Sequence, residues 1–167
     1  PGLASGQTLA TMCLTEPGAG SDLSRIRCRA AQNGATWQIS GEKIFISGGD
    51  QDLSEEILHL VLARTSDNGV KGLSLFLCPS TKADGTRNTV TVTRIEEKMG
   101  LHASPTCQLA FDGAEAELIG AEGQGLAAMF TMMNHARADV ALQGVAHAAR
   151  AHDVASAYAE ERQQGRT

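Results

Sequence analysis

The glycine-rich segment from Glu16 to Asp22 holds the residues best suited to binding a ligand. It comes directly after an expected strand over residues 9–15. Glycines let backbone N–H groups approach a bound molecule closely, and such groups favour phosphate and carbonyl oxygens. The hydroxyls of Thr15 and Ser21 add donors of the same kind. We therefore interpret this segment as a candidate ligand loop, with a plain β turn as the alternative.

A second candidate loop lies at residues 45–49, where another expected strand ends in an aromatic residue, a hydroxyl and two glycines. An aromatic ring beside a donor suits a planar heterocycle, because the ring of Phe45 covers one face while the hydroxyl of Ser47 bonds to the edge. Taken alone, Phe45 is as well explained as a core residue. The presence of two such loops favours a binding site.

Residues 123–128 read Gly-Gln-Gly-Leu-Ala-Ala and match the GxGxxA form of the dinucleotide-binding motif. That motif needs a strand before it, a second strand after its helix and an acidic residue about 20 positions further on. Only more helix is expected here. We therefore interpret these glycines as the entry into a helix.

No pattern of cysteines or histidines indicates a disulfide or a metal site. The cysteines lack a CxxC pair and lie among apolar residues, so we expect reduced thiols in the core of a cytoplasmic protein. The histidines form neither HExxH nor a helical pair at spacing four, so no metal site is expected. The cysteines are Cys13, Cys28, Cys78 and Cys107, and the histidines are His59, His102, His135, His147 and His152.

The composition is that of an ordinary globular chain, whose 167 residues allow one compact core with an appendage. Its 14 basic and 19 acidic residues give a net charge of −5 without any long block of like charges, which argues against nucleic-acid binding. No apolar run approaches the roughly 18 residues that span a bilayer, and no signal peptide is apparent, so no membrane association is expected.

Residues 9–119 alternate apolar and polar residues in short stretches separated by turn residues, which is typical of half-buried strands. We predict about seven strands and, since no helix falls between them, an antiparallel β-barrel or sandwich. Gly41 is expected to turn the chain between two strands of a meander. The stretches 57–63 and 73–78 are apolar on both faces and are predicted to be interior strands.

After Gly125 the sequence changes to alanine, methionine and charged residues at helical spacing. We predict one or two α-helices, with a joint at residues 134–137 and a second segment over residues 138–164. Such a helix needs partners to cover its apolar stripe, because packing supplies most helical stability in proteins. We therefore expect either a larger protein or a homo-oligomer.

Four segments, in the same order along the chain, resemble the acyl-CoA dehydrogenase family of flavoproteins. Residues 12–22, Met-Cys-Leu-Thr-Glu-Pro-Gly-Ala-Gly-Ser-Asp, resemble the first family motif, and residues 41–49 resemble the flavin-facing strand that follows it. Residues 98–106 resemble the next family block. Residues 123–137 resemble the helix that leads into the family's C-terminal bundle. The resemblance thus covers essentially the whole chain.

The resemblance implies a middle β-barrel domain at residues 1–122 and, at residues 123–167, the first helices of a truncated C-terminal helical bundle. It implies FAD as cofactor and an acyl-CoA substrate whose α,β bond is oxidised to the 2-enoyl-CoA. The electrons would pass to electron-transfer flavoprotein. A homo-oligomer is usual in the family.

The resemblance also assigns binding roles to residues of both loops and of the helix. Residues 12–15 would bring backbone and hydroxyl donors to the flavin, Ser47 would lie near its N5 atom, and Ser21 would contact both ligands. The implied FAD-binding residues are Met12, Cys13, Leu14, Thr15, Gly20, Ser21, Phe45, Ile46, Ser47 and Arg162, and the implied substrate-binding residues are Ser21, Asn134 and Arg137.

Several residues depart from the family pattern. Met12 stands where an aromatic is common, Phe45 where tryptophan is usual, Ser47 where threonine is usual, and His102 where many members have arginine. With the long loop at residues 48–56, these features are similar to the larger bacterial branch that includes methylthiopropanoyl-CoA dehydrogenases.

The family's catalytic glutamate falls in a part of the bundle beyond this chain, so no residue here is interpreted as catalytic. Glu16 and the other glutamates are interpreted as turn, surface or strand-end carboxylates. We expect the chain alone to lack dehydrogenase activity and to bind FAD weakly or not at all. Two alternatives stay open: an acyl-CoA oxidase or flavin monooxygenase of the same fold, and a non-catalytic β-barrel interaction module.

Overall fold

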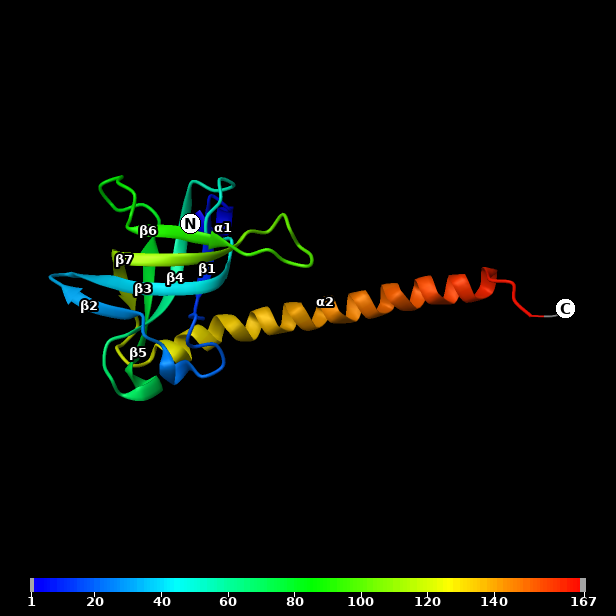
Figure 1. Ribbon diagram of the computed structural model, residues 1–167. Coiled ribbons are helices and arrows are strands. Elements are labelled where there is room, and N and C mark those ends of the chain that lie inside the picture. Colours follow the sequence, from blue (N-terminus) through cyan, green and yellow to red (C-terminus); the bar gives the residue numbers. More distant parts are fainter. Residues whose placement is uncertain (1, 166–167) are drawn as a thin grey trace. The chain divides into compact units, whose positions relative to one another are not determined.

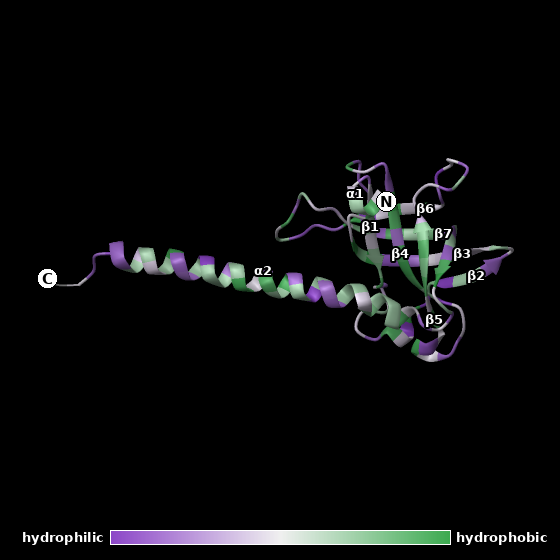
Figure 2. Cartoon of the chain, turned by 180° about the vertical axis from the view of Figure 1, so that it is seen from behind, coloured by the Kyte–Doolittle hydropathy of each residue, from purple (hydrophilic) through white to green (hydrophobic). Residues whose placement is uncertain are grey.

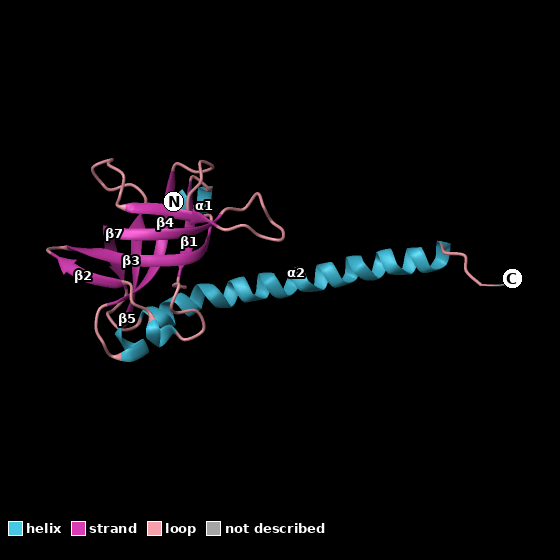
Figure 3. Cartoon of the chain, viewed as in Figure 1, coloured by secondary structure: helices cyan, strands magenta, loops and turns pink. Residues whose placement is uncertain are grey.

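The computed structural model describes residues 2–165 as a β-rich part followed by a long helix (Figures 1 and 3). The chain forms two compact units that divide after Met129, within the long helix. The elements are α1 (Gly2–Ser5), β1 (Thr8–Cys13), η1 (Leu23–Arg25), β2 (Arg29–Asn33), β3 (Thr36–Ser47), β4 (Glu56–Arg64), η2 (Gly69–Gly72), β5 (Leu73–Pro79), β6 (Val90–Ile95), β7 (Thr106–Ile119) and α2 (Gly125–Glu161).

The seven strands form one mixed sheet, which confirms the predicted strand number but not the all-antiparallel pairing. Strand β1 pairs with β4 in parallel over its whole length, and β2 meets β4 in parallel at one residue pair. The remaining pairs are antiparallel. Alternation in the sequence shows which side chains face inward but not the direction of the neighbouring strand. The long crossover between β1 and β4, which contains β2 and β3, permits the parallel pair.

The pairings run through β4, β2, β3, β7 and β5 and return to β4, with β1 and β6 added outside this ring. Because the seam between β2 and β4 consists only of Arg29 and Arg64, the sheet is not a clean barrel. An open pocket lies beside Arg64 at this narrow seam.

Strand β3 continues through Gly41, so the predicted turn at this glycine is wrong. Gly41 has φ +142°, and a Cβ atom there would lie 2.8 Å from the Cα atom of Cys28. The glycine therefore allows two backbone segments to pass closely within the sheet, which is a common use of glycine in strands.

The core lies between the long strands, where β4, β5 and β7 together carry more than half of the buried apolar residues, and Figure 2 shows apolar stretches along β4 and β5. Strand β5 is buried over most of its length and β4 over its second half, which confirms the predicted interior strands. All four cysteines are buried and free, as expected from their apolar surroundings.

The helix α2 is a single element of 37 residues, so the predicted joint at residues 134–137 is wrong. The joint contains no proline or glycine, and the Asn134 side chain accepts a hydrogen bond from Arg137 one turn later at 3.2 Å. That bond supports helix at the point where a break was expected. Within residues 2–165, no helix is long and apolar enough to cross a membrane.

A buried polar cluster joins β1 to β4. His59 is 1% exposed, and its Nδ1 atom lies 2.8 Å from the Thr11 hydroxyl, which in turn lies 3.3 Å from the Cys13 thiol. The imidazole packs edge-on against Phe111. Burial lowers the pKa of His59 from 6.5 to about 4.

We expect this histidine to make the fold acid-sensitive. The pKa of His59 is lower in the folded than in the unfolded chain. The unfolded chain therefore takes up a proton first, and the free energy of unfolding, highest above pH 6.5, falls as the pH is lowered toward 4. The loss amounts to about 3 kcal/mol of unfolding free energy. Urea unfolding from pH 4 to pH 7 measures it, and His59→Gln should flatten the profile. An unchanged slope in His59→Gln would assign the acid sensitivity to other groups.

Candidate functional site

The two candidate loops lie next to each other in the structure. The N–H of Ile44 donates to the carbonyl of Thr15 at 2.9 Å, which joins the end of β1 to the middle of β3. The glycine-rich loop then closes on itself, because Glu16 and Ala19 exchange two backbone hydrogen bonds of 3.1 Å each. The sequence predicted both loops, and the structure brings them together.

Three hydroxyl groups are left without partners at these strand ends. Within residues 2–165, the side chains of Thr15, Ser21 and Ser47 make no hydrogen bond. Thr15 is half-buried, whereas Gly20, Ser21 and Ser47 are exposed. These groups are therefore available to a bound molecule.

Phe45 projects outward because β3 contains a bulge. The register of β3 against β7 shifts between Lys43 and Ile46, and Phe45 has φ +60°, which is rare for a bulky residue. Its side chain is 59% exposed, and that of Met12 is 39% exposed. Holding a non-glycine residue in this conformation costs about 1–3 kcal/mol and is common at ligand sites.

The other residues predicted at the strand ends face inward. Cys13 and Ile46 are 0% and 1% exposed. Burial raises the pKa of the Cys13 thiol to about 12, so this side chain stays neutral and closed to solvent. These two residues, and the half-buried Leu14, can offer only backbone groups to a ligand. We name the exposed or half-buried set, Met12, Thr15, Phe45 and Ser47, the strand-end surface.

A buried ion pair beneath the strand-end surface was missed in the sequence. Lys43 Nζ lies 2.9 Å from Glu16 Oε1, and the two side chains are 0% and 6% exposed. Glu16 was interpreted as a turn, surface or strand-end carboxylate; it does lie at the turn after β1, but it is buried, so a surface position is wrong. The alternation of β3 could have predicted the burial of Lys43. This residue lies four positions after the buried Ile39, and residues at an even spacing in a strand point to the same face.

The strand-end surface fits a planar heteroaromatic cofactor such as a flavin. Phe45 and Met12 offer apolar area for a ring face, while Thr15 and Ser47 offer unpaired donors for the polar edge. No acid or base for proton transfer is available there, because Glu16 is committed to Lys43 and to two backbone N–H groups. The surface can therefore bind and orient a cofactor but does not itself carry acid–base chemistry.

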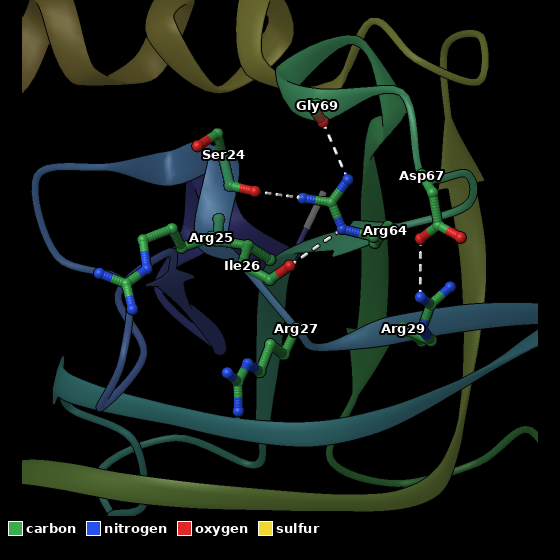
Figure 4. Close-up of a pocket in the computed structure, with 8 residues that line it drawn as sticks. All are labelled: Ser24, Arg25, Ile26, Arg27, Arg29, Arg64, Asp67 and Gly69. Atoms are coloured by element: carbon green, nitrogen blue, oxygen red, sulfur yellow. Dashed lines mark hydrogen bonds and ion pairs between the residues drawn. The ribbon is translucent and has the colours of Figure 1, made fainter.

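A separate open pocket of about 520 Å³ lies beside the narrow seam between β2 and β4 (Figure 4). Four arginines line it, although the whole chain is acidic. Arg29 pairs with Asp67 at 2.7 Å. Among the described residues, the guanidinium groups of Arg25 and Arg27 have no hydrogen bond or ion pair. We name this site the arginine pocket; it is lined by Ser24, Arg25, Ile26, Arg27, Arg29, Arg64, Asp67 and Gly69.

Arg64 forms the inner wall of the arginine pocket and is 6% exposed. Its guanidinium donates to four backbone carbonyls, and the described residues place no carboxylate against it. The bonds reach Ile26 and Ser24 on one side and Ser66 and Gly69 on the other, at 2.9–3.1 Å. This arginine therefore ties the segment after the glycine-rich loop to the β4–β5 connection.

The predicted residues of the helix are exposed. Asn134 and Arg137 bond to each other, and the Arg137 guanidinium lies 5.2 Å from the ring centre of Phe130. Arg162 follows the end of α2, where its N–H donates to the Tyr158 carbonyl at 2.9 Å. Among residues 2–165, no group of three or more metal-ligating side chains occurs.

The fold is a seven-stranded mixed sheet followed by a long helix, and two loops that the sequence singled out lie next to each other in it. The chain belongs to the acyl-CoA dehydrogenase family, because residues 11–114 match the family's middle domain. This confirms the family indicated by the sequence motifs.

Curated relatives and solved structures agree with this family. The 3-methylmercaptopropionyl-CoA dehydrogenase of Ruegeria pomeroyi is 51% identical over 172 residues, covering 98% of this chain and 29% of the relative. A structure titled as an FAD-dependent dehydrogenase matches with a TM-score of 0.85 and 27% identity, over 99% of this chain and 43% of that one. A structure of the electron transferring flavoprotein of Acidaminococcus fermentans matches with a TM-score of 0.78 and 32% identity, over 93% and 40%. The chain thus spans well under half the length of the proteins it matches.

Proposed function

We propose that this chain is the flavin-binding middle part, residues 1–122, and the first helical part, residues 123–167, of an FAD-dependent acyl-CoA dehydrogenase. The observation that carries the proposal is the strand-end surface, where unpaired donors of Thr15 and Ser47 stand beside the exposed ring of Phe45. A bare turn would explain neither the unpaired hydroxyls nor the strained, outward aromatic.

In this function, bound FAD supplies the hydride acceptor. The chain's own residues would hold it: Met12 and Phe45 cover apolar ring area and exclude water, while Thr15 and Ser47 donate hydrogen bonds to its polar edge. Such donors favour the added negative charge that comes with reduction. Gly20 and Ser21 would contact FAD and the substrate. No proton is moved by a side chain of this part of the protein.

The arginine pocket would hold the phosphate groups of the acyl-CoA. Arginine binds phosphate oxygens with paired N–H groups, and Arg25 and Arg27 have no protein partner among the described residues. Arg64 adds a buried positive charge behind them. On the family resemblance, Asn134 and Arg137 would bind substrate, and Arg162 would bind FAD.

We further propose a short thioester of the methylthiopropanoyl type as substrate, supported by the name of the relative from Ruegeria pomeroyi and by the departures at Met12, Phe45, Ser47 and His102. Electron-transfer flavoprotein would be the acceptor, in a cytoplasmic homo-oligomer. The resemblance of the whole chain supports these proposals.

The complete protein that contains this chain tests the function. With FAD bound, it should oxidise 3-methylthiopropanoyl-CoA to the 2-enoyl thioester, bleach its flavin absorbance, and pass the electrons to electron-transfer flavoprotein. The matching pantetheine thioester, which lacks the nucleotide phosphates, should react with a KM higher by about tenfold or more, because it forms no contact with the arginine pocket. Rapid formation of peroxide in air would instead indicate an oxidase, and failure to bind FAD would overturn the proposal.

A further inference from the structure

The buried ion pair of Lys43 and Glu16 connects three segments beneath the strand-end surface. Lys43 Nζ donates to Glu16 Oε1 at 2.9 Å and to the Leu14 carbonyl at 3.0 Å. The Glu16 carboxylate also accepts the N–H groups of Arg27 and Cys28 at 2.7 and 3.0 Å. The pair thus fixes the end of β1 against β3 and against the entry into β2.

One of these bonds acts on the peptide unit that joins Leu14 to Thr15. The carbonyl of this unit accepts the Lys43 ammonium, while its N–H, which belongs to Thr15, makes no hydrogen bond within residues 2–165. The chain contains no cis peptide among the described residues, so the carbonyl and the N–H of this unit point in opposite directions. A cation on the carbonyl polarises the whole unit and strengthens its N–H as a donor.

We infer that Lys43 is a positioning residue that holds and polarises the Leu14–Thr15 peptide, so that Thr15 presents a fixed, strengthened donor to the flavin. This inference rests on the proposed function. Glu16 sets the geometry by holding the ammonium beneath the carbonyl, and it also offsets part of its charge. The site would therefore favour the reduced flavin, which carries more negative charge, over the oxidised form.

Stability alone is a poor explanation for such a pair. Two charges withdrawn from water are often no more stabilising than apolar residues of similar volume. The Lys43 charge also acts on the Cys13 and Cys28 thiols, but burial outweighs it and raises their pKa values to about 12 and 11. These thiols are neutral, so Glu16 is the carboxylate left to balance Lys43.

The test compares Lys43→Met with Glu16→Gln in the complete protein that contains this chain. We measure the dissociation constants of oxidised and reduced FAD, and unfolding by urea. Both variants should be less stable. Lys43→Met should lower the preference for reduced FAD by about threefold to tenfold, whereas Glu16→Gln, which leaves the cation unbalanced, should raise it. A tenfold change in this ratio corresponds to about 30 mV for a two-electron couple.

Asn88→Ala is the matched control, because Asn88 is 3% exposed and donates to the Pro79 and Glu115 carbonyls away from the strand ends. It should lose stability without changing the preference between the two forms of FAD. Shifts of opposite sign in the two test variants support the inference. Shifts of equal sign, or none beyond that of Asn88→Ala, overturn it while FAD binding and the proposed function stand. If Lys43→Met does not fold, Glu16→Gln alone decides. A higher preference for reduced FAD in this variant supports the inference, and an unchanged or lower preference overturns it. A wild-type protein that binds no FAD overturns both.

Discussion

Gly125→Ala should disrupt the packing of the start of α2 against β5 and destabilise the fold. A Cβ atom at this position would lie 2.3 Å from the carbonyl carbon of Ser74 and 2.5 Å from the nitrogen of Leu75, and these backbone atoms belong to a central strand. Neither can move without breaking sheet hydrogen bonds. We expect a loss of about 3 kcal/mol or more in unfolding free energy, above the usual cost of overpacking. Urea unfolding followed by circular dichroism measures it.

Gly144→Ala is the control for this prediction. Gly144 lies in the same helix, and a Cβ atom there meets nothing within 4 Å. Alanine is the better helix former, so this variant should gain roughly 0.5–1 kcal/mol. The same substitution in one helix should therefore have opposite signs at the two positions. Equal effects would show that the close approach of Gly125 to β5 does not exist in solution.

The same glycines show what the sequence could indicate. The GxGxxA match was interpreted as a helix entry and not as a dinucleotide motif, and the structure confirms this, because Gly123 donates its N–H to the Ser74 hydroxyl at 2.9 Å and Gly125 begins α2 against β5. The strands, the buried cysteines and the positions of the two loops could also be predicted, because alternation and turn residues are local signals.

Features that depend on residues far apart in the chain could not be predicted from the sequence. The parallel pairing of β1 with β4 joins residues nearly 50 positions apart, and alternation carries no sign of strand direction. The outward turn of Phe45 arises from a bulge set by the register against β7. Arg64 ends the apolar second half of β4, and only the fold shows that four carbonyls converge on it. The long helix was divided wrongly because a local mix of polar residues was taken for a break.

Arg64→Met should cost about 3–5 kcal/mol of unfolding free energy. The methionine keeps much of the side-chain volume but leaves the Ser24, Ile26, Ser66 and Gly69 carbonyls without their donor, and losing bonds to a buried charged group is costly. The segment that follows the glycine-rich loop should also loosen, since two of these carbonyls belong to it. Urea unfolding gives the energy, and amide hydrogen exchange at residues 23–26 and 66–69 gives the location.

Arg29→Met is the matched control, because it removes an arginine from the rim of the same pocket. Its ion pair with Asp67 is exposed, with side chains 61% and 79% accessible, and such pairs contribute between about 0 and 1 kcal/mol. Arg64→Lys separates charge from geometry: it keeps the cation, but a single ammonium cannot reach carbonyls on both sides, so little stability should return. If Arg64→Lys were as stable as the wild type, charge alone would suffice and the fork of bonds across the seam would be unimportant. If Arg64→Met lost no more unfolding free energy than Arg29→Met, the buried guanidinium would contribute no more to stability than a surface group, and its four bonds would not be what holds the wall of the arginine pocket.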